Sequence, residues 1–264
     1  MQDLKVTLFQ SDLVWENTQM NLDNFSKKFE LLTEKTDLII LPEMFNTGFA
    51  VEPENVAETI SGPTMHWLRE KASLLDCVIA GSLIIYDNGN FYNRFVWMQA
   101  DGFFYTYDKR HLFRMGGEHH KFSSSDKSIV ISYKGWKIRP SICYDLRFPV
   151  WTKNNFSNEV YDYDLLIYVA NWPTARVDVW KTLLKARAIE NQAIVVGVNR
   201  IGKDGNGLDH CGPTMVINER GEIIAQVDEN HEGFCTASLS LGALSDFRKK
   251  FTVGLDWDRF EILG

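Results

Sequence analysis

The chain has 264 residues, of which 45% are hydrophobic and 24% charged, the composition of a globular protein that can bury a sizeable core. Its net charge is -7 without a long basic run, which argues against nucleic acid or an anionic lipid surface as a partner. No apolar run approaches the roughly 20 residues of a membrane-spanning helix, and the four cysteines form no CxxC pair, which argues against a zinc ribbon or a disulfide scaffold.

The first half of the chain alternates predicted strands and helices. Leu22, Phe25, Phe29 and Leu32 recur every three or four residues, the pattern of an amphipathic helix. Asp101-Gly102 between two apolar runs predicts a hairpin. The predicted strands cover 5–10, 37–42, 77–85, 93–98 and 103–107, and the predicted helices cover 21–34 and 62–75.

The second half continues the same alternation. Strands are expected on both sides of the turn Lys134-Gly135-Trp136, and again around the turn at 219–221. No repeat or linker interrupts the pattern, so the sequence predicts one layered α/β domain over residues 1–264. The predicted strands cover 129–133, 137–142, 165–169, 193–199, 214–218 and 223–227, and the predicted helix covers 177–192.

Cys143 is the strongest candidate for a nucleophile. It follows the apolar run 138–142, at a strand end where α/β proteins place many active sites. A free cysteine is also a common small core residue, but the charged neighbours Asp145 and Arg147 are unusual for an inert core position.

Three further charged residues are candidates for chemistry. Glu43 ends the apolar run DLIILP, where burial would raise its pKa towards that of a general base. Lys109 follows the strand 103–107 and could stabilise a thiolate or an oxyanion. Glu118 lies in the loop GGEHHKF. Each of the three could instead be a solvated loop residue.

Other catalytic classes fit the sequence less well. His111, His119 and His120 cluster, but the spacing H-x7-H-H is not that of a helical zinc motif. Neither local signature of a cysteine–histidine protease surrounds Cys143. The phosphate-binding patterns GxGxxG and GxxxxGK[ST] do not occur.

Four segments carry a resemblance to a known family. LPEMFNTGF, YDKRHLF, SICYDLRFP and NWP occur in this order over 41–173, each at a predicted strand end, and a compatible helix ends in RAIENQ. Together they closely resemble the nitrilase superfamily of carbon–nitrogen hydrolases. The resemblance implies a four-layer αββα sandwich, often paired into a homodimer or a higher homo-oligomer.

The resemblance also implies the catalytic residues. It places a Glu–Lys–Cys triad on Glu43, Lys109 and Cys143, and a second family glutamate on Glu118. Glu43 would take the thiol proton, and Lys109 with the backbone amide of Tyr144 would meet the oxyanion. No metal or organic cofactor is required.

Within the superfamily, the segments look most like omega-amidases, which hydrolyse the terminal amide of 2-oxoglutaramate and 2-oxosuccinamate. Arg147, four residues after Cys143, could pair with the carboxylate of such a substrate, or instead form a structural ion pair with Asp145 or a nearby carboxylate. Phe49 and Trp172 could wall a small pocket or simply belong to the core.

Alternative functions remain open from sequence alone. The substrate could be an N-carbamoyl amino acid, another carboxamide or a nitrile, and an inactive binding module on the same fold is a further alternative. The first residues lack the layout of a signal peptide, so a cytoplasmic enzyme with a small-molecule amide substrate is the expectation.

Overall fold

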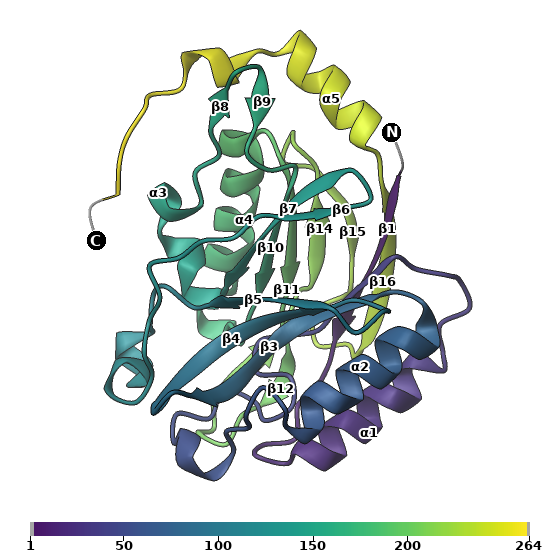
Figure 1. Ribbon diagram of the computed structural model, residues 1–264, viewed down its shortest axis with the longest axis vertical. Helices are drawn as coiled ribbons and strands as arrows, with labels where there is room; N and C mark the ends of the chain where they lie inside the picture. The colour runs from purple at the N-terminus through teal and green to yellow at the C-terminus, as the bar shows by residue number, and fades with distance from the viewer. Residues whose placement is uncertain (1–2, 263–264) are drawn as a thin grey trace.

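Two six-stranded mixed sheets form the centre of the protein (Figure 1). The computed structural model describes residues 3–262, so the predicted domain of residues 1–264 extends at both ends beyond the described residues. The first sheet has the order β16-β1-β2-β3-β4-β5. Its strands are β1 (Leu4–Gln10), β2 (Leu38–Ile40), β3 (Val78–Asp87), β4 (Asn90–Met98), β5 (Phe104–Asp108) and β16 (Gly233–Leu239).

The second sheet has the order β15-β14-β11-β10-β7-β6. Strands β7, β10 and β11 run parallel, as do β1, β2 and β3 in the first sheet. The parallel runs therefore place their carboxyl ends at one edge of each sheet. The strands are β6 (Ile131–Tyr133), β7 (Trp136–Ile142), β10 (Leu165–Val169), β11 (Ile194–Val198), β14 (Met215–Ile217) and β15 (Ile223–Gln226).

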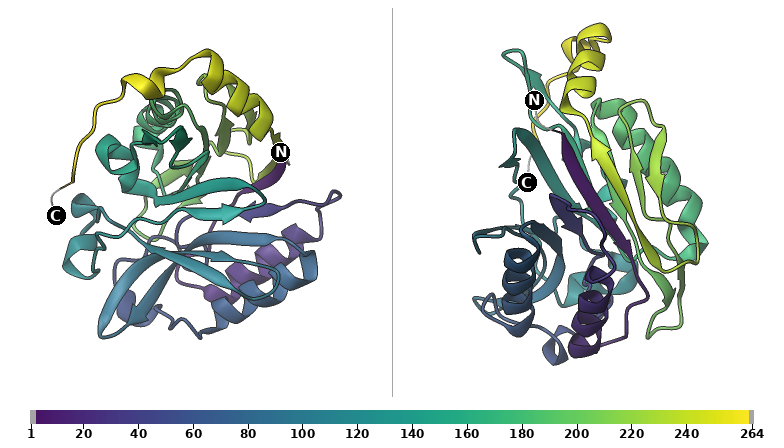
Figure 2. Two further views of the ribbon diagram at one scale, coloured as in Figure 1. Left: turned by 45° about the horizontal axis from the view of Figure 1, so that its top comes forward. Right: turned by 90° about the vertical axis from the view of Figure 1, so that its right-hand side faces the viewer.

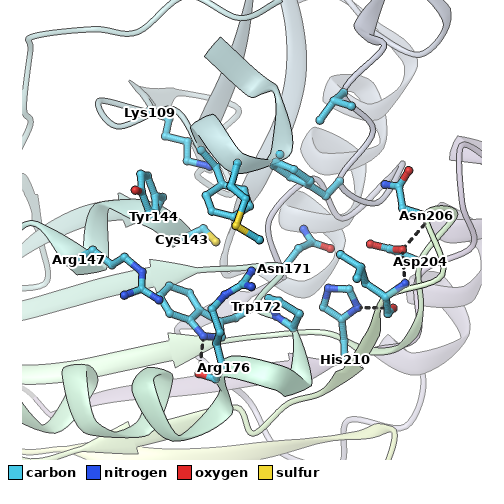
Figure 3. A pocket seen from close by; sticks show the side chains of 17 residues that line it. Lys109, Cys143, Tyr144, Arg147, Asn171, Trp172, Arg176, Asp204, Asn206 and His210 are labelled. Atoms are coloured by element: carbon cyan, nitrogen blue, oxygen red, sulfur yellow. Dashed lines mark hydrogen bonds between the residues drawn. The ribbon is translucent and has the colours of Figure 1, made fainter. Parts of the chain in front are cut away.

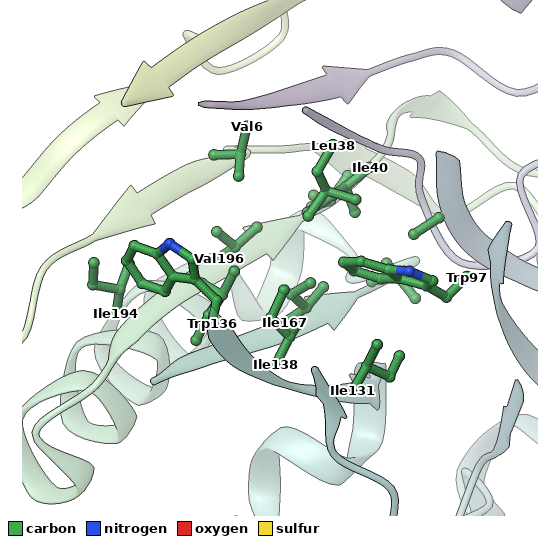
Figure 4. Close-up of a cluster of buried hydrophobic side chains, with 14 of the residues drawn as sticks. Val6, Leu38, Ile40, Trp97, Ile131, Trp136, Ile138, Ile167, Ile194 and Val196 are labelled. Carbon is green, nitrogen blue, oxygen red and sulfur yellow. The ribbon is translucent and has the colours of Figure 1, made fainter. Parts of the chain in front are cut away.

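The main hydrophobic core lies between the two sheets (Figure 4). Val6, Leu38 and Trp97 extend from the first sheet and meet Ile138 and Ile167 of the second. All five are fully buried. Strands β2 and β10 are continuous apolar runs because both of their faces are covered, whereas β1 and β7 alternate apolar and polar residues.

Helices cover the outer face of each sheet (Figure 2). Phe25 of α1 and Leu68 of α2 pack on the first sheet, while Trp180 and Leu184 of α4 pack on the second. The predicted four-layer αββα sandwich is thereby confirmed. The helices are α1 (Thr18–Phe29), α2 (Pro63–Leu75), α3 (Pro149–Thr152), α4 (Val177–Asn191) and α5 (Leu241–Lys250).

Several predicted boundaries are confirmed and others are wrong. The helices predicted at 62–75 and 177–192 correspond to α2 and α4. The helix predicted over 21–34 instead runs from Thr18 to Phe29, because the chain leaves the helix at the cap residue Glu30. Sequence reasoning missed β16, α5 and two small hairpins, β8 (Phe156–Ser157) with β9 (Val160–Tyr161) and β12 (Ile201–Lys203) with β13 (Asp209–Cys211).

Membrane insertion through a helix finds no support in the part of the chain described. Across residues 3–262, none of the helices combines the length and the apolar character needed to cross a bilayer.

Candidate active site

The ends of strands from both sheets bring the sequence candidates together. Glu43 lies three residues after β2, and Lys109 directly follows β5, both in the first sheet. Cys143 directly follows β7, and Asn171 lies two residues after β10, both in the second sheet. The site is therefore assembled across the interface between the sheets.

Lys109 is held between two carboxylates. Its Nζ lies 2.9 Å from Glu43 Oε1 and 3.0 and 3.1 Å from the two carboxylate oxygens of Glu118. All three side chains are fully buried, so the alternative that they are solvated loop residues is wrong for each. An unpaired charge at such depth would be costly, and here each charge has a partner.

Asn93, on β4, links the two carboxylates. Its Nδ2 donates a hydrogen bond of 2.7 Å to Glu43 Oε1 and one of 3.1 Å to Glu118 Oε1. The backbone N–H of Phe113 donates to Glu118 Oε2 at 2.6 Å. Glu118 thus meets donors on both of its oxygens and is fixed as an acceptor.

The protonation of the group follows from these contacts. Burial alone would lower the pKa of Lys109, but the charges of Glu118 and Glu43 outweigh burial and raise it, so the ammonium persists. Burial raises the pKa of Glu118, with the charge of Glu43 adding to the effect and that of Lys109 opposing it.

Cys143 sits at a tight turn facing these residues. Its backbone adopts a left-handed conformation with φ of 43°, which is uncommon for a residue other than glycine and recurs at functional sites. Burial raises the pKa of the Cys143 thiol well above its ordinary value, as do the charge of Glu43 and the hydrogen bond between them, while Lys109 lowers it. The resting residue is therefore a thiol, in line with the expectation that Glu43 takes its proton.

Asp145 anchors the turn that carries Cys143. Its Oδ2 accepts hydrogen bonds from the backbone N–H of Ile142 at 3.0 Å and from the Tyr107 hydroxyl at 2.7 Å. Its Oδ1 accepts from the backbone N–H of His111 at 3.0 Å and lies 2.8 Å from His111 Nδ1. Arg187, from the RAIENQ segment, donates to the Leu146 carbonyl at 2.5 Å on the same turn.

A cavity of about 300 Å³ opens in front of Cys143 (Figure 3). Phe49, Tyr144, Arg147 and Trp172 all line it, as the sequence predicts. Trp172 is also a core residue, since its ring lies 5.5 Å from that of Trp180. The lining further includes Lys109, Phe113, Asn171, Arg176, Asp204, Asn206 and His210.

Arg147 does not form the predicted alternative ion pair with Asp145, whose oxygens are occupied by the donors described above. Its guanidinium carbon lies 5.1 Å from the ring centre of Trp172. Of the three histidines, His119 and His120 lie together with ring centres 3.8 Å apart, while His111 stacks on Phe148 with ring centres 3.7 Å apart. Over residues 3–262, no group of three or more potential metal ligands is found.

Four residues of the site lie outside the set predicted from sequence. Asn171 opens the NWP segment, and its position after a buried strand was a usable signal. Asn93 is a polar residue within an apolar strand, which is a weaker signal. Asp145 was noticed only as a charged neighbour of Cys143. Arg176, just before α4, offered no local signal.

Comparison with known proteins defines the family. The family model for carbon–nitrogen hydrolases matches residues 5–249. The chain therefore belongs to the carbon–nitrogen hydrolase family, which confirms the resemblance to the nitrilase superfamily, and it is an enzyme that hydrolyses carbon–nitrogen bonds.

Three relatives match the chain along nearly all of its length. The omega-amidase YafV of Escherichia coli (strain K12) is 43% identical over 99% of this chain and 100% of its own. The omega-amidase YafV of Yersinia enterocolitica is 45% identical, with 100% of each chain covered. The crystal structure of XC1258 from Xanthomonas campestris, a CN-hydrolase superfamily protein with an arsenic adduct in its active site, is 42% identical, with a TM-score of 0.96 over 100% of both chains.

Proposed function

We propose that the protein is an omega-amidase that hydrolyses the terminal amide of 2-oxoglutaramate or 2-oxosuccinamate to the 2-oxo acid and ammonia. The main observation that supports this proposal is a buried cluster. In it, Lys109 lies between Glu43 and Glu118, while Glu43 contacts the Cys143 thiol. The similarity to relatives named omega-amidase supports the same substrate class.

In the first step, Cys143 attacks the amide carbonyl. Because the thiol is protonated at rest, Glu43 takes its proton as the sulfur–carbon bond forms. The carbonyl oxygen becomes an oxyanion, which the Lys109 ammonium and the backbone N–H of Tyr144 stabilise. One such donor typically lowers the activation barrier by about 2.7–4 kcal/mol.

Collapse of the tetrahedral intermediate breaks the carbon–nitrogen bond. Glu43 returns the proton to the leaving nitrogen, so ammonia departs and a thioester on Cys143 remains. Glu43 then takes a proton from water as the water oxygen attacks the thioester. The carbon–sulfur bond breaks, Glu43 returns the proton to the Cys143 sulfur, and the 2-oxo acid leaves. Glu118 fixes Lys109 for both steps through its contacts at 3.0 and 3.1 Å.

The cavity selects the substrate in this proposal. Arg147 pairs with the substrate carboxylate through its planar guanidinium group, and Phe49 and Trp172 enclose the carbon chain. A volume of about 300 Å³ suits a substrate of this small size.

Ammonia release tests the proposal directly. The assay compares 2-oxoglutaramate, 2-oxosuccinamate, an N-carbamoyl amino acid, a simple carboxamide and a nitrile, with the Cys143→Ala variant beside each. We expect release from the two 2-oxo amides and none above background from Cys143→Ala, while Cys235→Ala, outside the cavity, keeps full activity. Turnover of the carbamoyl compound alone would replace the substrate assignment, and an active Cys143→Ala would refute the mechanism.

A trapped intermediate tests the thioester itself. Rapid acid quenching during turnover should yield a Cys143 peptide heavier by the acyl group of the substrate, and the Glu43→Gln variant should accumulate less of it. A 2-oxo amide hydrolysed by wild type without any acylated peptide would contradict the covalent route.

We also propose that the protein is a cytoplasmic homodimer or higher homo-oligomer formed through helical contacts, as the family resemblance implies. Light scattering over a wide concentration range should report at least twice the monomer mass of 30.4 kDa. A constant monomer mass would refute this assembly.

A further inference from the structure

A second arginine faces the cavity beside Arg147. Arg176 ends the 3-10 turn Thr174–Arg176, immediately before α4. It is half-buried, and its guanidinium carbon lies 5.5 Å from the ring centre of Phe113, on the cavity wall. Figure 3 shows the guanidinium groups of Arg147 and Arg176 on the same side of the cavity as Cys143, near the indole of Trp172.

Neither arginine has an acidic partner within the described residues 3–262. Arg94 is paired with Asp87 and Asp108, and Arg248 with Asp164. By contrast, Arg147 is exposed and Arg176 half-buried, and both face the cavity. A charge that faces a cavity without a partner retains its capacity for a ligand. Arg147 and Arg176 are therefore both available to an anion.

The aromatic surroundings hold the two guanidinium groups in place. Trp172 is fixed by Asn199, which accepts from its backbone N–H at 2.8 Å and donates to its carbonyl at 3.0 Å. The indole N–H of Trp172 donates to the Arg176 carbonyl at 2.8 Å, and Arg147 lies over the same ring. Trp172 thus contacts both arginines, the guanidinium of Arg147 through its ring and the backbone of Arg176 through its indole N–H.

The positive charge of the cavity lies on the wall that carries the two arginines. The charge of Lys109 is already compensated by Glu43 and Glu118. Asp204 is the one carboxylate among the described lining residues, and its Oδ1 accepts from the backbone N–H groups of Asn206 and Leu208 at 2.9 Å. Three cationic and three acidic side chains line or adjoin the site, so its total charge is zero, but the two guanidinium groups lie together beside Trp172 and make that wall locally positive.

We propose that Arg176 is a second specificity-determining residue, which with Arg147 clamps the substrate carboxylate and restricts the enzyme to monoanionic amides. This inference rests on the proposed omega-amidase function and deepens it. A zwitterion such as glutamine carries an ammonium next to its carboxylate, and two guanidinium groups repel that ammonium, whereas a 2-oxo group in its place is uncharged. The clamp therefore accepts 2-oxo acid amides and rejects amino acid amides.

The kinetic test uses two amides of equal length. Succinamate carries a carboxylate where butyramide has a methyl group. In Arg176→Gln, kcat/KM should fall about 10- to 100-fold for 2-oxoglutaramate and succinamate, mainly through KM, and stay near wild type for butyramide. Arg176→Lys should recover part of the loss, because it keeps the charge without the planar fork. Arg69→Gln, an exposed arginine on α2, is the matched control.

Two kinetic outcomes would overturn the proposal. An equal loss on succinamate and butyramide would mean that Arg176 only supports the fold of the wall. Unchanged kinetics on the anionic amides would mean that it does not contact the carboxylate.

A binding measurement separates this proposal from the proposed function. With Cys143→Ala as parent, succinamate, a monoanion that this variant should not hydrolyse, should raise the thermal midpoint, and the added Arg176→Gln substitution should weaken its apparent affinity about 10- to 100-fold. If no amide is hydrolysed but this binding difference appears, the clamp stands and the omega-amidase assignment fails. If succinamate does not bind, or binds equally to both variants, the clamp is refuted.

Discussion

Asn171 and Glu43 are joined by two hydrogen bonds that run between the two sheets. The backbone N–H of Asn171 donates to Glu43 Oε2 at 2.8 Å, and its side-chain amide donates to the Glu43 carbonyl at 2.6 Å. Glu43 follows β2 of the first sheet and Asn171 follows β10 of the second. The carboxylate that faces Cys143 is therefore oriented by a residue from the same sheet as Cys143.

Removing the side chain of Asn171 should loosen this link without abolishing it. Asn171→Ala keeps the backbone donor to Oε2 and loses only the bond to the carbonyl, so we expect kcat to fall about tenfold with little change in KM. Steady-state kinetics on the amide that the wild type hydrolyses fastest measure this change in kcat, with the exposed Asn55→Ala as control. An unchanged kcat would show that the backbone bond alone positions Glu43.

Replacing Glu43 should change the chemistry of Cys143 in a defined direction. Glu43 raises the pKa of the thiol through its charge and its hydrogen bond, so Glu43→Gln should lower that pKa. The rate of alkylation of Cys143 by iodoacetamide, followed by peptide mass mapping, should then rise at lower pH than in wild type, even though kcat falls about 10²- to 10⁴-fold.

Two internal references accompany that measurement. Burial raises the pKa of Cys77 and of Cys235 to about 12, so both should label slowly at neutral pH in every variant. Lys109→Met should shift the Cys143 profile the opposite way, because it removes the charge that lowers the thiol pKa. A Glu43→Gln profile displaced to higher pH would contradict this account of the thiol.

Asp145 should matter for stability and catalysis together. Its two oxygens receive donors from Ile142, Tyr107 and His111, and Asp145→Asn places an amide N–H₂ against one set of those donors. We expect a loss of about 1–3 kcal/mol in the free energy of unfolding by urea, together with a lower kcat as the Cys143 turn shifts. The exposed Asp126→Asn should change neither, and a fully stable Asp145→Asn would rule out the anchoring role.

His210 should make the protein less stable in acid. Burial, with the charge of Arg200, lowers the pKa of His210 from 6.5 to about 4. Above pH 6.5 the imidazole is neutral in both the folded and the unfolded protein, so it does not change the free energy of unfolding. As pH falls from 6.5 to about 4, the unfolded chain takes up a proton that the folded protein refuses, so about 3 kcal/mol of stability is lost.

Urea unfolding across that pH range checks the effect. His210→Gln should flatten the pH dependence in this window, and the exposed His231→Gln should leave it as in wild type. An equal pH dependence in wild type and His210→Gln would show that other residues, and not His210, cause the loss of stability in acid.

The residues of the buried cluster could be singled out from the sequence because the short segments that resemble the family contain them. Glu43, Lys109 and Cys143 each follow an apolar strand, so a charged or nucleophilic residue there stands out. Arg176 has no such context. It joins the site only because the turn after β10 brings it over Phe113, which is 63 positions away in the chain.

The errors in the fold have similar physical causes. Leu32 continues the helical spacing beyond Phe29 because it packs on the same core from outside the helix, so periodicity alone extends the helix too far. Strand β16 is only partly buried and pairs with β1 from the other end of the chain, a contact that no local pattern reports. Helix α5 was missed because it buries only Leu244 and Arg248.

Because the site is divided between two sheets, the rate of hydrolysis depends on how the two sheets are positioned relative to each other. A displacement of about 1 Å between Glu43 and Cys143 can cost about 10²-fold in rate while every strand remains intact. Core residues such as Trp97 and Ile138 touch no substrate, yet they set that distance. Mild denaturant or a conservative core substitution should thus abolish activity while circular dichroism still shows the native secondary structure.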